Sequence, residues 1–255
     1  SSAAGDRGGR SALRNPKTLL IRNCLRVATL DAHMREIAGG DIYIEDNRIT
    51  AVGKAIRRKA DRVIDGRGKV ALPGFVNTHH HLYQTFQRNV PYVQNAELFD
   101  WLITLYEIWR ELTPEVVYTS ALVGLGELLL TGCTCSSDHF YVFPKNQSPE
   151  LLDQEIRAAA KVGIRFLATR GSMSRGRSHG GLPPDDVVQT GDVIMRDCER
   201  VVDRYHDPAT DSMCRVGISP CSPFSVTTEL LMEAATFARK KGVRLHTHLA
   251  ETRDE

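Results

Sequence analysis

Residues 73–81, Pro-Gly-Phe-Val-Asn-Thr-His-His-His, contain the feature that decides the fold. A short apolar strand runs directly into three histidines. Because successive strand residues point to opposite faces, we expect His79 and His81 to project together while His80 points away. Two imidazoles at one strand end supply half of the ligands that a zinc ion takes. Three consecutive histidines more often belong to a surface or a packed strand end, so a metal site requires further ligands elsewhere in the chain.

Residues 245–251, Leu-His-Thr-His-Leu-Ala-Glu, supply further ligands at the end of a predicted fifth strand. In parallel barrels the active site lies at the C-terminal ends of the strands, where the two histidine groups would meet. Three neutral imidazoles leave a position open for a water molecule, which the metal acidifies into a usable hydroxide. The spacing leaves both His246 and His248 open as the third ligand. Glu251 follows at the strand's mouth, where a carboxylate can carry a proton.

The sequence pattern predicts an α/β protein with three parts. Residues 1–16 are expected to be disordered or carried over from cloning, residues 17–72 to form a small N-terminal β-sandwich domain, and residues 73–255 to begin a TIM-like (β/α)8 barrel. Strands of the small domain are predicted at 18–22, 41–45, 48–52 and 62–65. Barrel strands are predicted to end at His81 and to span 133–138, 164–169, 215–219 and 243–248, with helices at 113–132, 150–162, 192–205 and 227–242.

The number of strand–helix steps bears on the extent of the barrel. About five such units follow residue 73, and a closed eight-stranded barrel typically needs about 250 residues by itself. We therefore expect the sequence to be the N-terminal part of a barrel, with a five-stranded open sheet as the alternative.

Composition excludes several classes of partner. The sequence has 33 basic and 31 acidic side chains and a net charge of +2, which gives no electrostatic reason to expect nucleic acid or membrane partners. Six scattered cysteines show no zinc-knuckle spacing and are expected to be reduced thiols of a cytoplasmic protein. No signal peptide is recognised at the start of the sequence.

The two histidine motifs, with a small β domain before them, resemble the amidohydrolase superfamily in its cytosine/guanine deaminase and chlorohydrolase-like branch. The resemblance covers nearly the whole sequence. It implies that His79, His81 and His248 bind the metal, because the family pattern on strand five is His-X-X-Glu, and that Glu251 shuttles protons. The family's further metal-site residues, a strand-six histidine and a strand-eight aspartate, would lie beyond Glu255.

The end of strand four bears on the number of metal ions. Residues 219–223, Ser-Pro-Cys-Ser-Pro, lack the bridging lysine that binuclear members of the superfamily carry. The resemblance therefore implies one divalent metal, with Zn²⁺ as the first choice and Fe²⁺ as the alternative.

The resemblance also implies a substrate. Residues 79–91, 98–102 and 137–141 are most similar to bacterial 8-oxoguanine deaminases, so the expected reaction converts 8-oxoguanine into urate and ammonia. Four residues are the expected substrate contacts. Gln84 would place its amide against the purine carbonyl, and Cys221 stands where guanine deaminases carry arginine. Arg170 lies at the end of strand three, and Trp109 offers an aromatic side chain. Core packing is the commoner role of a tryptophan such as Trp109.

Other functions are alternatives to this reaction. Within the superfamily they are an s-triazine amino- or chlorohydrolase and a guanine- or cytosine-type deaminase. A protein of another class, a non-catalytic scaffold with the amidohydrolase fold, would have no need of a metal. The expected partner is a small heterocyclic substrate, and self-association into a homo-oligomer would be in keeping with the relatives that the chain resembles.

Overall fold

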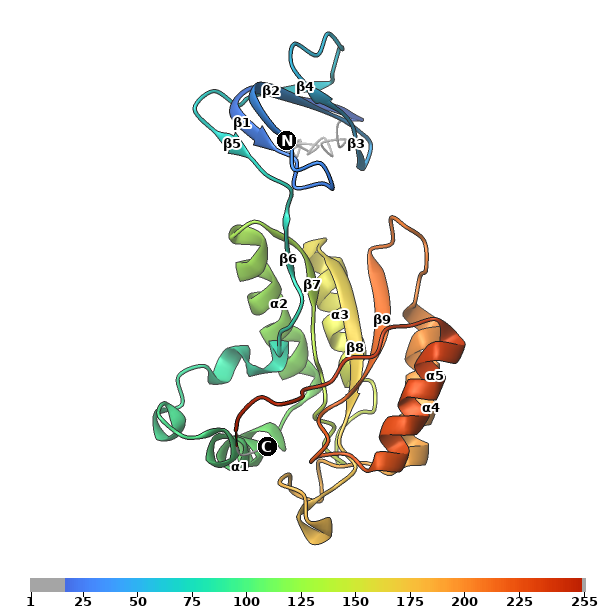
Figure 1. Cartoon of the computed structure of the whole chain (residues 1–255). Coiled ribbons are helices and arrows are strands. Elements are labelled where there is room, and N and C mark those ends of the chain that lie inside the picture. Colours follow the sequence, from blue (N-terminus) through green and yellow to red (C-terminus); the bar gives the residue numbers. More distant parts are fainter. Residues whose placement is uncertain (1–16, 254–255) are drawn as a thin grey trace, which may run out of the picture. The chain divides into compact units, whose positions relative to one another are not determined.

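Residues 17–253 are described by a computed structural model, in which the chain divides into two compact units between Pro73 and Gly74 (Figure 1). The expectation for residues 1–16 falls outside the described residues.

The first unit contains one mixed sheet of five strands. The strands are β1 (Thr18–Ala28), β2 (Glu36–Glu45), β3 (Arg48–Gly53), β4 (Arg62–Asp65) and β5 (Val70–Ala71). They follow the order β3-β2-β1-β4, in which β5 also pairs with β1. Cys24, Val27 and Ile42 form its buried apolar cluster. The described part of this unit has a single sheet, so the predicted β-sandwich is not confirmed. The strands β1 and β2 are longer than the sequence predicts.

The second unit alternates strands with helices, as the sequence predicts for an α/β protein. Its strands are β6 (Phe75–Asn77), β7 (Cys133–Ser137), β8 (Arg165–Ser172) and β9 (Cys214–Pro220), which pair in parallel in that order. Its helices are α1 (Leu98–Trp109), α2 (Pro114–Leu130), α3 (Leu151–Val162), α4 (Gly191–Tyr205) and α5 (Thr228–Lys241), with short 3₁₀ helices η1 (Leu82–Gln87), η2 (Pro91–Val93) and η3 (Arg177–His179).

The order of the strands determines where the helices lie. The chain adds each new parallel strand beside the previous one, and right-handed crossovers of this kind place the connecting helices on one side of the sheet. Accordingly, α2 contacts β7, α3 contacts β8, α4 contacts both β8 and β9, and α5 contacts β9 (Figure 1). The carboxyl ends of the strands therefore lie at one common edge, where a barrel of this type forms its active site.

Capping residues explain why the helices begin and end where the sequence predicts. The Thr113 hydroxyl accepts a hydrogen bond from Val116 N at 3.3 Å at the start of α2. Gly132, Gly163 and Gly242 follow α2, α3 and α5 with positive φ angles of 91°, 77° and 69°. Glycine adopts this conformation without the steric cost that other residues incur, so it ends a helix readily.

The two histidine segments differ from the strands predicted for them. β6 ends at Asn77 and not at His81, so the first histidines lie in the segment that follows the strand. The predicted strand at 243–248 contains only an isolated bridge, between Ile218 and Leu245. Backbone hydrogen bonds still align this segment with β9, since His246 N donates to Ile218 O at 2.9 Å. Residues 243–248 thus occupy the position beside β9 that a fifth strand would take.

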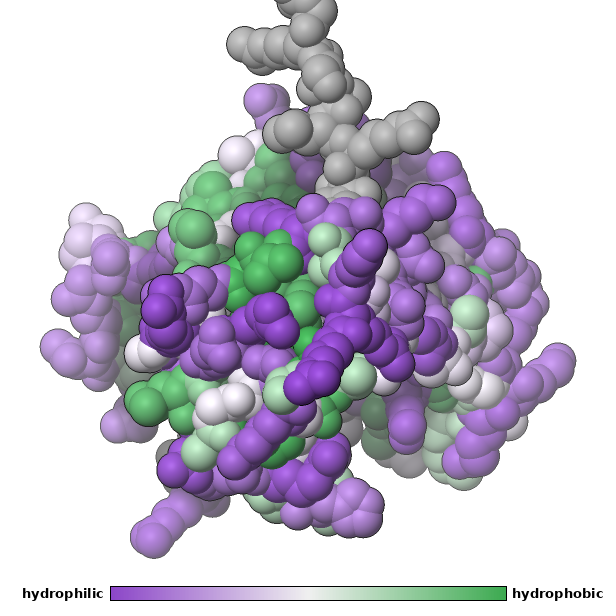
Figure 2. All heavy atoms as spheres, turned by 90° about the horizontal axis from the view of Figure 1, so that it is seen from above, coloured by the Kyte–Doolittle hydropathy of each residue, from purple (hydrophilic) through white to green (hydrophobic). Residues whose placement is uncertain are grey.

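Two general features of the described residues concern possible partners. No helix there combines the length and the apolar character needed to cross a membrane. On the face shown in Figure 2, hydrophilic side chains predominate and hydrophobic ones form smaller patches between them. Separately, all six cysteines are free thiols in the structure.

Candidate metal centre

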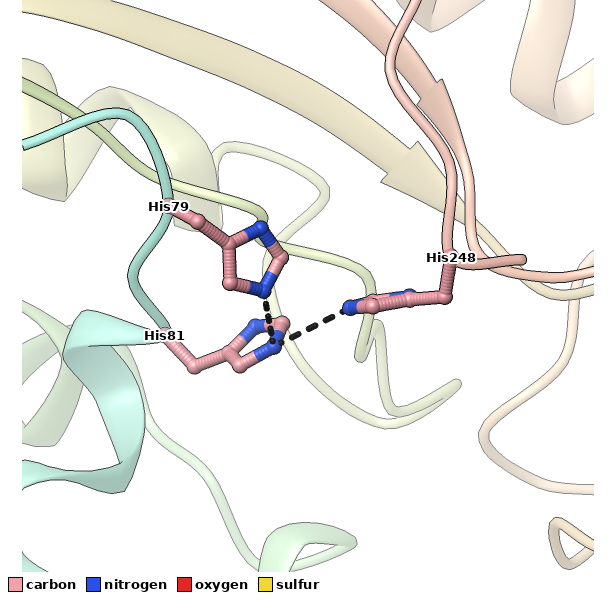
Figure 3. Close-up of side chains that lie close together, drawn as sticks. All are labelled: His79, His81 and His248. Atoms are coloured by element: carbon pink, nitrogen blue, oxygen red, sulfur yellow. Dashed lines mark hydrogen bonds between the residues drawn. The ribbon is translucent and has the colours of Figure 1, made fainter. Parts of the chain in front are cut away.

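Three imidazoles converge where the segment after β6 meets the segment beside β9. Figure 3 shows that His79 and His81 point toward the ring of His248, which approaches from the other side. The Nε2 atom of His81 lies 3.2 Å from Nε2 of His79 and 3.3 Å from Nε2 of His248. The structure therefore brings together the three ligands that the resemblance implies.

The other ring nitrogens show which atoms are free to bind a metal. His81 Nδ1 lies 2.8 Å from the carbonyl oxygen of His139, and His248 Nδ1 lies 2.7 Å from that of Cys221. Because a carbonyl oxygen only accepts, both Nδ1 atoms carry the proton, and in the neutral rings both Nε2 atoms present lone pairs. These two lone pairs face each other at 3.3 Å and cannot hydrogen-bond to one another. A cation between them would resolve this arrangement.

The donor set fits zinc. Two ligands, each about 2.0–2.1 Å from a tetrahedrally coordinated zinc ion, lie about 3.4 Å apart, close to the observed separations of the Nε2 atoms. Burial, and then the neighbouring His248 and His246, lower the pKa of His79 to about 4, and burial lowers the pKa of His81 to about 3. Both rings are therefore neutral at physiological pH, as metal ligands must be. The hydrogen bonds to backbone carbonyls hold the rings in position, as outer-shell partners do in zinc sites.

Two more histidines pack against this cluster. His246 Nε2 lies 3.1 Å from His79 Nδ1, so it approaches the nitrogen of His79 that faces away from His81. His139 is buried, lies flat against the ring of His248 with 4.3 Å between ring centroids, and places its Nε2 3.2 Å from the carbonyl oxygen of Ser219. His79, His139 and His246 form a second possible ligand group. The convergence of three Nε2 atoms, two of them on rings anchored to carbonyls, favours His79, His81 and His248.

A small cavity of about 80 Å³ opens beside the histidine cluster. His81, His248, Gln84, Cys221 and Glu251 contribute to its wall. The remaining wall is mostly apolar and aromatic: Leu98, Trp101, Leu102, Tyr106, Tyr141, Ser222 and Phe224. A mostly apolar and aromatic wall with a few polar groups is the lining typical of small-molecule sites.

The backbone between His248 and Glu251 turns sharply. Ala250 has a φ angle of 53°, in the left-handed region that a non-glycine residue adopts at an energetic cost. With this turn, Glu251 lines the same cavity as His248 three residues before it. A carboxylate and two imidazoles of the cluster therefore face one small volume, as a metal-assisted proton transfer requires.

Cys221 contributes to the site in two ways. Its side chain lines the cavity, and its carbonyl oxygen accepts the hydrogen bond from His248 Nδ1. Burial raises the pKa of the thiol to about 12, and hydrogen bonds to Ser225 and Ser222 oppose this only in part. The thiol is therefore protonated at physiological pH, so it is a wall residue and not a thiolate nucleophile.

Arg170, predicted as a substrate contact, lies elsewhere. Its side chain is 0% exposed, and its guanidinium pairs with Asp197 of α4 and stacks on the ring of Phe143 at 3.6 Å. Alternation along β8 turns the side chain away from the cavity and toward α4, although the residue lies near the strand's carboxyl end. The structure thus gives Arg170 a role in stability, and the prediction of a substrate contact is wrong.

This pair leads to a prediction about stability. Asp197→Ala leaves the buried guanidinium unpaired, so the free energy of unfolding should fall by about 3–5 kcal/mol. Chemical denaturation monitored by circular dichroism measures the change. Asp203→Ala on the same helix removes an exposed partner of Lys241 and should cost under about 1 kcal/mol. Equal losses in the two variants would contradict the role given to Arg170.

Trp109 is the second predicted contact that the structure places in the core. It is 0% exposed and packs edge-to-face against Tyr83 and Tyr106. Trp101, one of the cavity residues, packs against it with 5.4 Å between ring centroids. The two tryptophans lie on one face of α1, so their spacing could not show which of them lines the cavity.

Sequence reasoning did not select several cavity residues. Tyr141 and Ser222 follow the ends of β7 and β9, so the rule that barrel sites form at strand ends was a usable signal for both. Tyr106 and Phe224 come from a helix and a loop, and no motif distinguishes them from core residues.

Comparisons with known proteins identify the family of the chain. The profile of the Amidohydrolase family matches residues 70–255. The chain is 44% identical over 238 residues to an 8-oxoguanine deaminase of Pseudomonas aeruginosa, covering 92% of this chain and 52% of that protein. It is 34% identical to a hydroxydechloroatrazine ethylaminohydrolase of Pseudomonas sp. strain ADP, covering 92% and 51%.

A solved structure extends the comparison to the fold. Atrazine chlorohydrolase from Arthrobacter aurescens TC1, crystallised with zinc, superposes with a TM-score of 0.88 at 37% identity and covers 92% of this chain and 54% of that one. The chain spans about half the length of the relatives that it matches. With a family profile that matches most of its residues, the chain belongs to the amidohydrolase family.

Proposed function

We propose that the protein is a metal-dependent deaminase of an amino-substituted, purine-like heterocycle, with 8-oxoguanine as the substrate. The observation that carries the proposal is that Glu251 lines one small cavity together with His81 and His248, two of the three imidazoles that converge on one point. The reaction replaces the exocyclic amine by oxygen, so that 8-oxoguanine and water yield urate and ammonia.

The roles of the chain's own residues follow from their positions. A zinc ion held by His79, His81 and His248 would acidify water and so supply a nucleophile at neutral pH. Glu251 would accept one proton from that water and pass it to a ring nitrogen, and would then carry the second proton of the water to the departing amine, which leaves as ammonia. The apolar wall would limit access of bulk water and strengthen these charge interactions.

The residues that line the cavity support a flat heterocycle as the substrate. Trp101 and Phe224 line it and offer aromatic faces against which a ring can stack. Gln84 also lines it, and its Nε2 donates to the Tyr83 hydroxyl at 3.3 Å, which orients the amide. An amide both donates and accepts, so it suits the carbonyl and N–H edge of an oxidised purine.

The identity of the substrate rests chiefly on the 44% identity to an 8-oxoguanine deaminase. The second candidate is a hydrolase of substituted s-triazines, which the ethylaminohydrolase and chlorohydrolase relatives favour. The two reactions use the same metal chemistry on flat nitrogen heterocycles, so only a direct comparison of substrates separates them.

The test is ammonia release from 8-oxoguanine, guanine and a hydroxy-s-triazine by the purified, zinc-loaded protein. We expect fast release from 8-oxoguanine and little from guanine, because Cys221 stands where guanine deaminases carry arginine. Release from the triazine alone would establish the second candidate. A protein that purifies without metal and releases no ammonia from any of the three would match a non-catalytic scaffold.

Gln84 is expected to bind substrate without affecting the metal. Gln84→Leu removes its hydrogen bonds to the heterocycle, and KM for 8-oxoguanine should rise by about tenfold or more. Steady-state kinetics together with zinc analysis measure both properties. Gln94→Leu, at an exposed position, is the control and should leave KM unchanged. An unchanged KM in Gln84→Leu would remove this residue from the binding site.

A further inference from the structure

Two carboxylic acids lie buried behind the metal centre and take no part in the proposed chemistry. Asp138 directly follows β7, and Glu155 lies on α3. Both side chains are 0% exposed. Among the described residues, no cationic side chain pairs with either of them. A buried carboxylate without a cation is costly, so the pair requires another source of stabilisation.

The two acids stabilise each other through a hydrogen bond. Burial raises the pKa of both groups, and the negative charge of Asp138 raises that of Glu155 further. Two carboxylates in contact cannot both be ionised, and a bond between them requires a proton. No donor among the described residues reaches Asp138 Oδ2 or either carboxyl oxygen of Glu155, so only a proton shared between the two acids can satisfy them. Glu155 therefore holds the proton and donates it to the Asp138 carboxylate.

The other oxygen of Asp138 reaches the metal-binding segment. Asp138 Oδ1 accepts a hydrogen bond from Leu82 N at 2.6 Å, a short distance typical of an ionised acceptor. The adjacent His139 donates its N–H to His80 O at 2.8 Å and accepts from His81 Nδ1 through its carbonyl. Two residues after β7 thus hold three consecutive residues around the ligand His81.

We propose that Asp138 and Glu155 are positioning residues of the metal centre. One proton shared between the two acids keeps Asp138 as the acceptor that holds the backbone N–H of Leu82 and, through this residue, the adjacent ligand His81. The inference rests on the proposed metal site. Outer-shell partners of this kind typically change metal affinity by 10–100-fold.

Two substitutions of similar volume separate the shared proton from packing. Glu155→Gln keeps a donor for Asp138 and keeps one negative charge in the pair. Glu155→Met fills the same space without a donor. We expect zinc affinity, measured by competition with a chelator, to stay within about threefold of wild type in the Gln variant and to fall by about tenfold or more in the Met variant.

Asp153→Asn serves as the control for general destabilisation. Asp153 is a buried acid on the same helix, but its carboxylate pairs with Arg200 and accepts a hydrogen bond from the Tyr205 hydroxyl, both on α4. Its substitution should lower the melting temperature and leave zinc affinity unchanged. Wild-type zinc affinity in Glu155→Met, or an equal loss in Glu155→Gln, would overturn the positioning role.

Infrared spectroscopy of the zinc-free protein tests the shared proton separately from the metal site. Wild type at neutral pH should show the carbonyl stretch of a protonated carboxylic acid, and Glu155→Gln should lack it. Absence of this band from wild type would overturn the shared proton, even if Glu155→Met did not fold. If the band is present but wild type binds no zinc, the proposed metal site fails and the positioning role with it.

Discussion

Glu251→Gln should retain zinc and lose ammonia release by about 10²–10⁴-fold, because glutamine keeps the shape of the side chain but cannot carry a proton. The residue lines the cavity beside His248 without belonging to the histidine cluster, so the metal should remain bound. Steady-state assays on 8-oxoguanine, combined with zinc analysis of the same sample, measure both properties.

A second glutamate provides the matched control for this variant. Glu233→Gln removes an exposed carboxylate from α5 and should leave turnover as in wild type. Wild-type activity in Glu251→Gln would remove this residue from the mechanism. Loss of zinc from Glu251→Gln would indicate that the carboxylate belongs to the ligand set.

His81→Ala should release the metal, because Nε2 of His81 lies within 3.3 Å of both other ligand atoms. We expect zinc affinity to fall by about a hundredfold or more, beyond the effect of losing an outer-shell partner. Chelator competition measures the affinity, and turnover should fall with zinc occupancy.

The adjacent histidine is the natural control for His81→Ala. His80 has Arg88 and Glu127 as its charged neighbours and is absent from both possible ligand groups. His80→Ala should therefore keep zinc. A His81→Ala variant with full zinc occupancy, or a His80→Ala variant that loses zinc, would show that the ligand set is misplaced.

The sequence predicted the helices and the inner strands of the second unit well, because local signals define them. Thr113 and Pro114 begin α2, and Gly163 and Gly242 end α3 and α5 in left-handed conformations. The order of the parallel strands then places their carboxyl ends together. The meeting of the two histidine motifs could be foreseen from this topology alone.

The histidine segments were harder to predict because their conformations depend on tertiary contacts. Strand alternation suggested that His79 and His81 would share a face, yet β6 ends at Asn77. Backbone contacts between the segment after β7 and the segment after β6 hold the ligand in place instead, since His139 N donates to His80 O. Such long-range hydrogen bonds leave no periodic signal in a sequence.

Arg170 and Trp109 show a second limit. The position of Arg170 near a strand end suggested a site residue, but its alternation on β8 turns it toward Asp197. Trp109 and Trp101 lie eight residues apart on one helix face, and only packing shows which of them faces the cavity. A sequence indicates that a residue lies near a site more readily than it indicates where the side chain points.

The most direct test of metal-dependent deamination is ammonia release from 8-oxoguanine before and after the protein is stripped of metal. Zinc-loaded protein should release ammonia, the stripped protein should be inactive, and one equivalent of zinc per chain should restore the activity. Undiminished release by the stripped protein would contradict the central role of the histidine cluster.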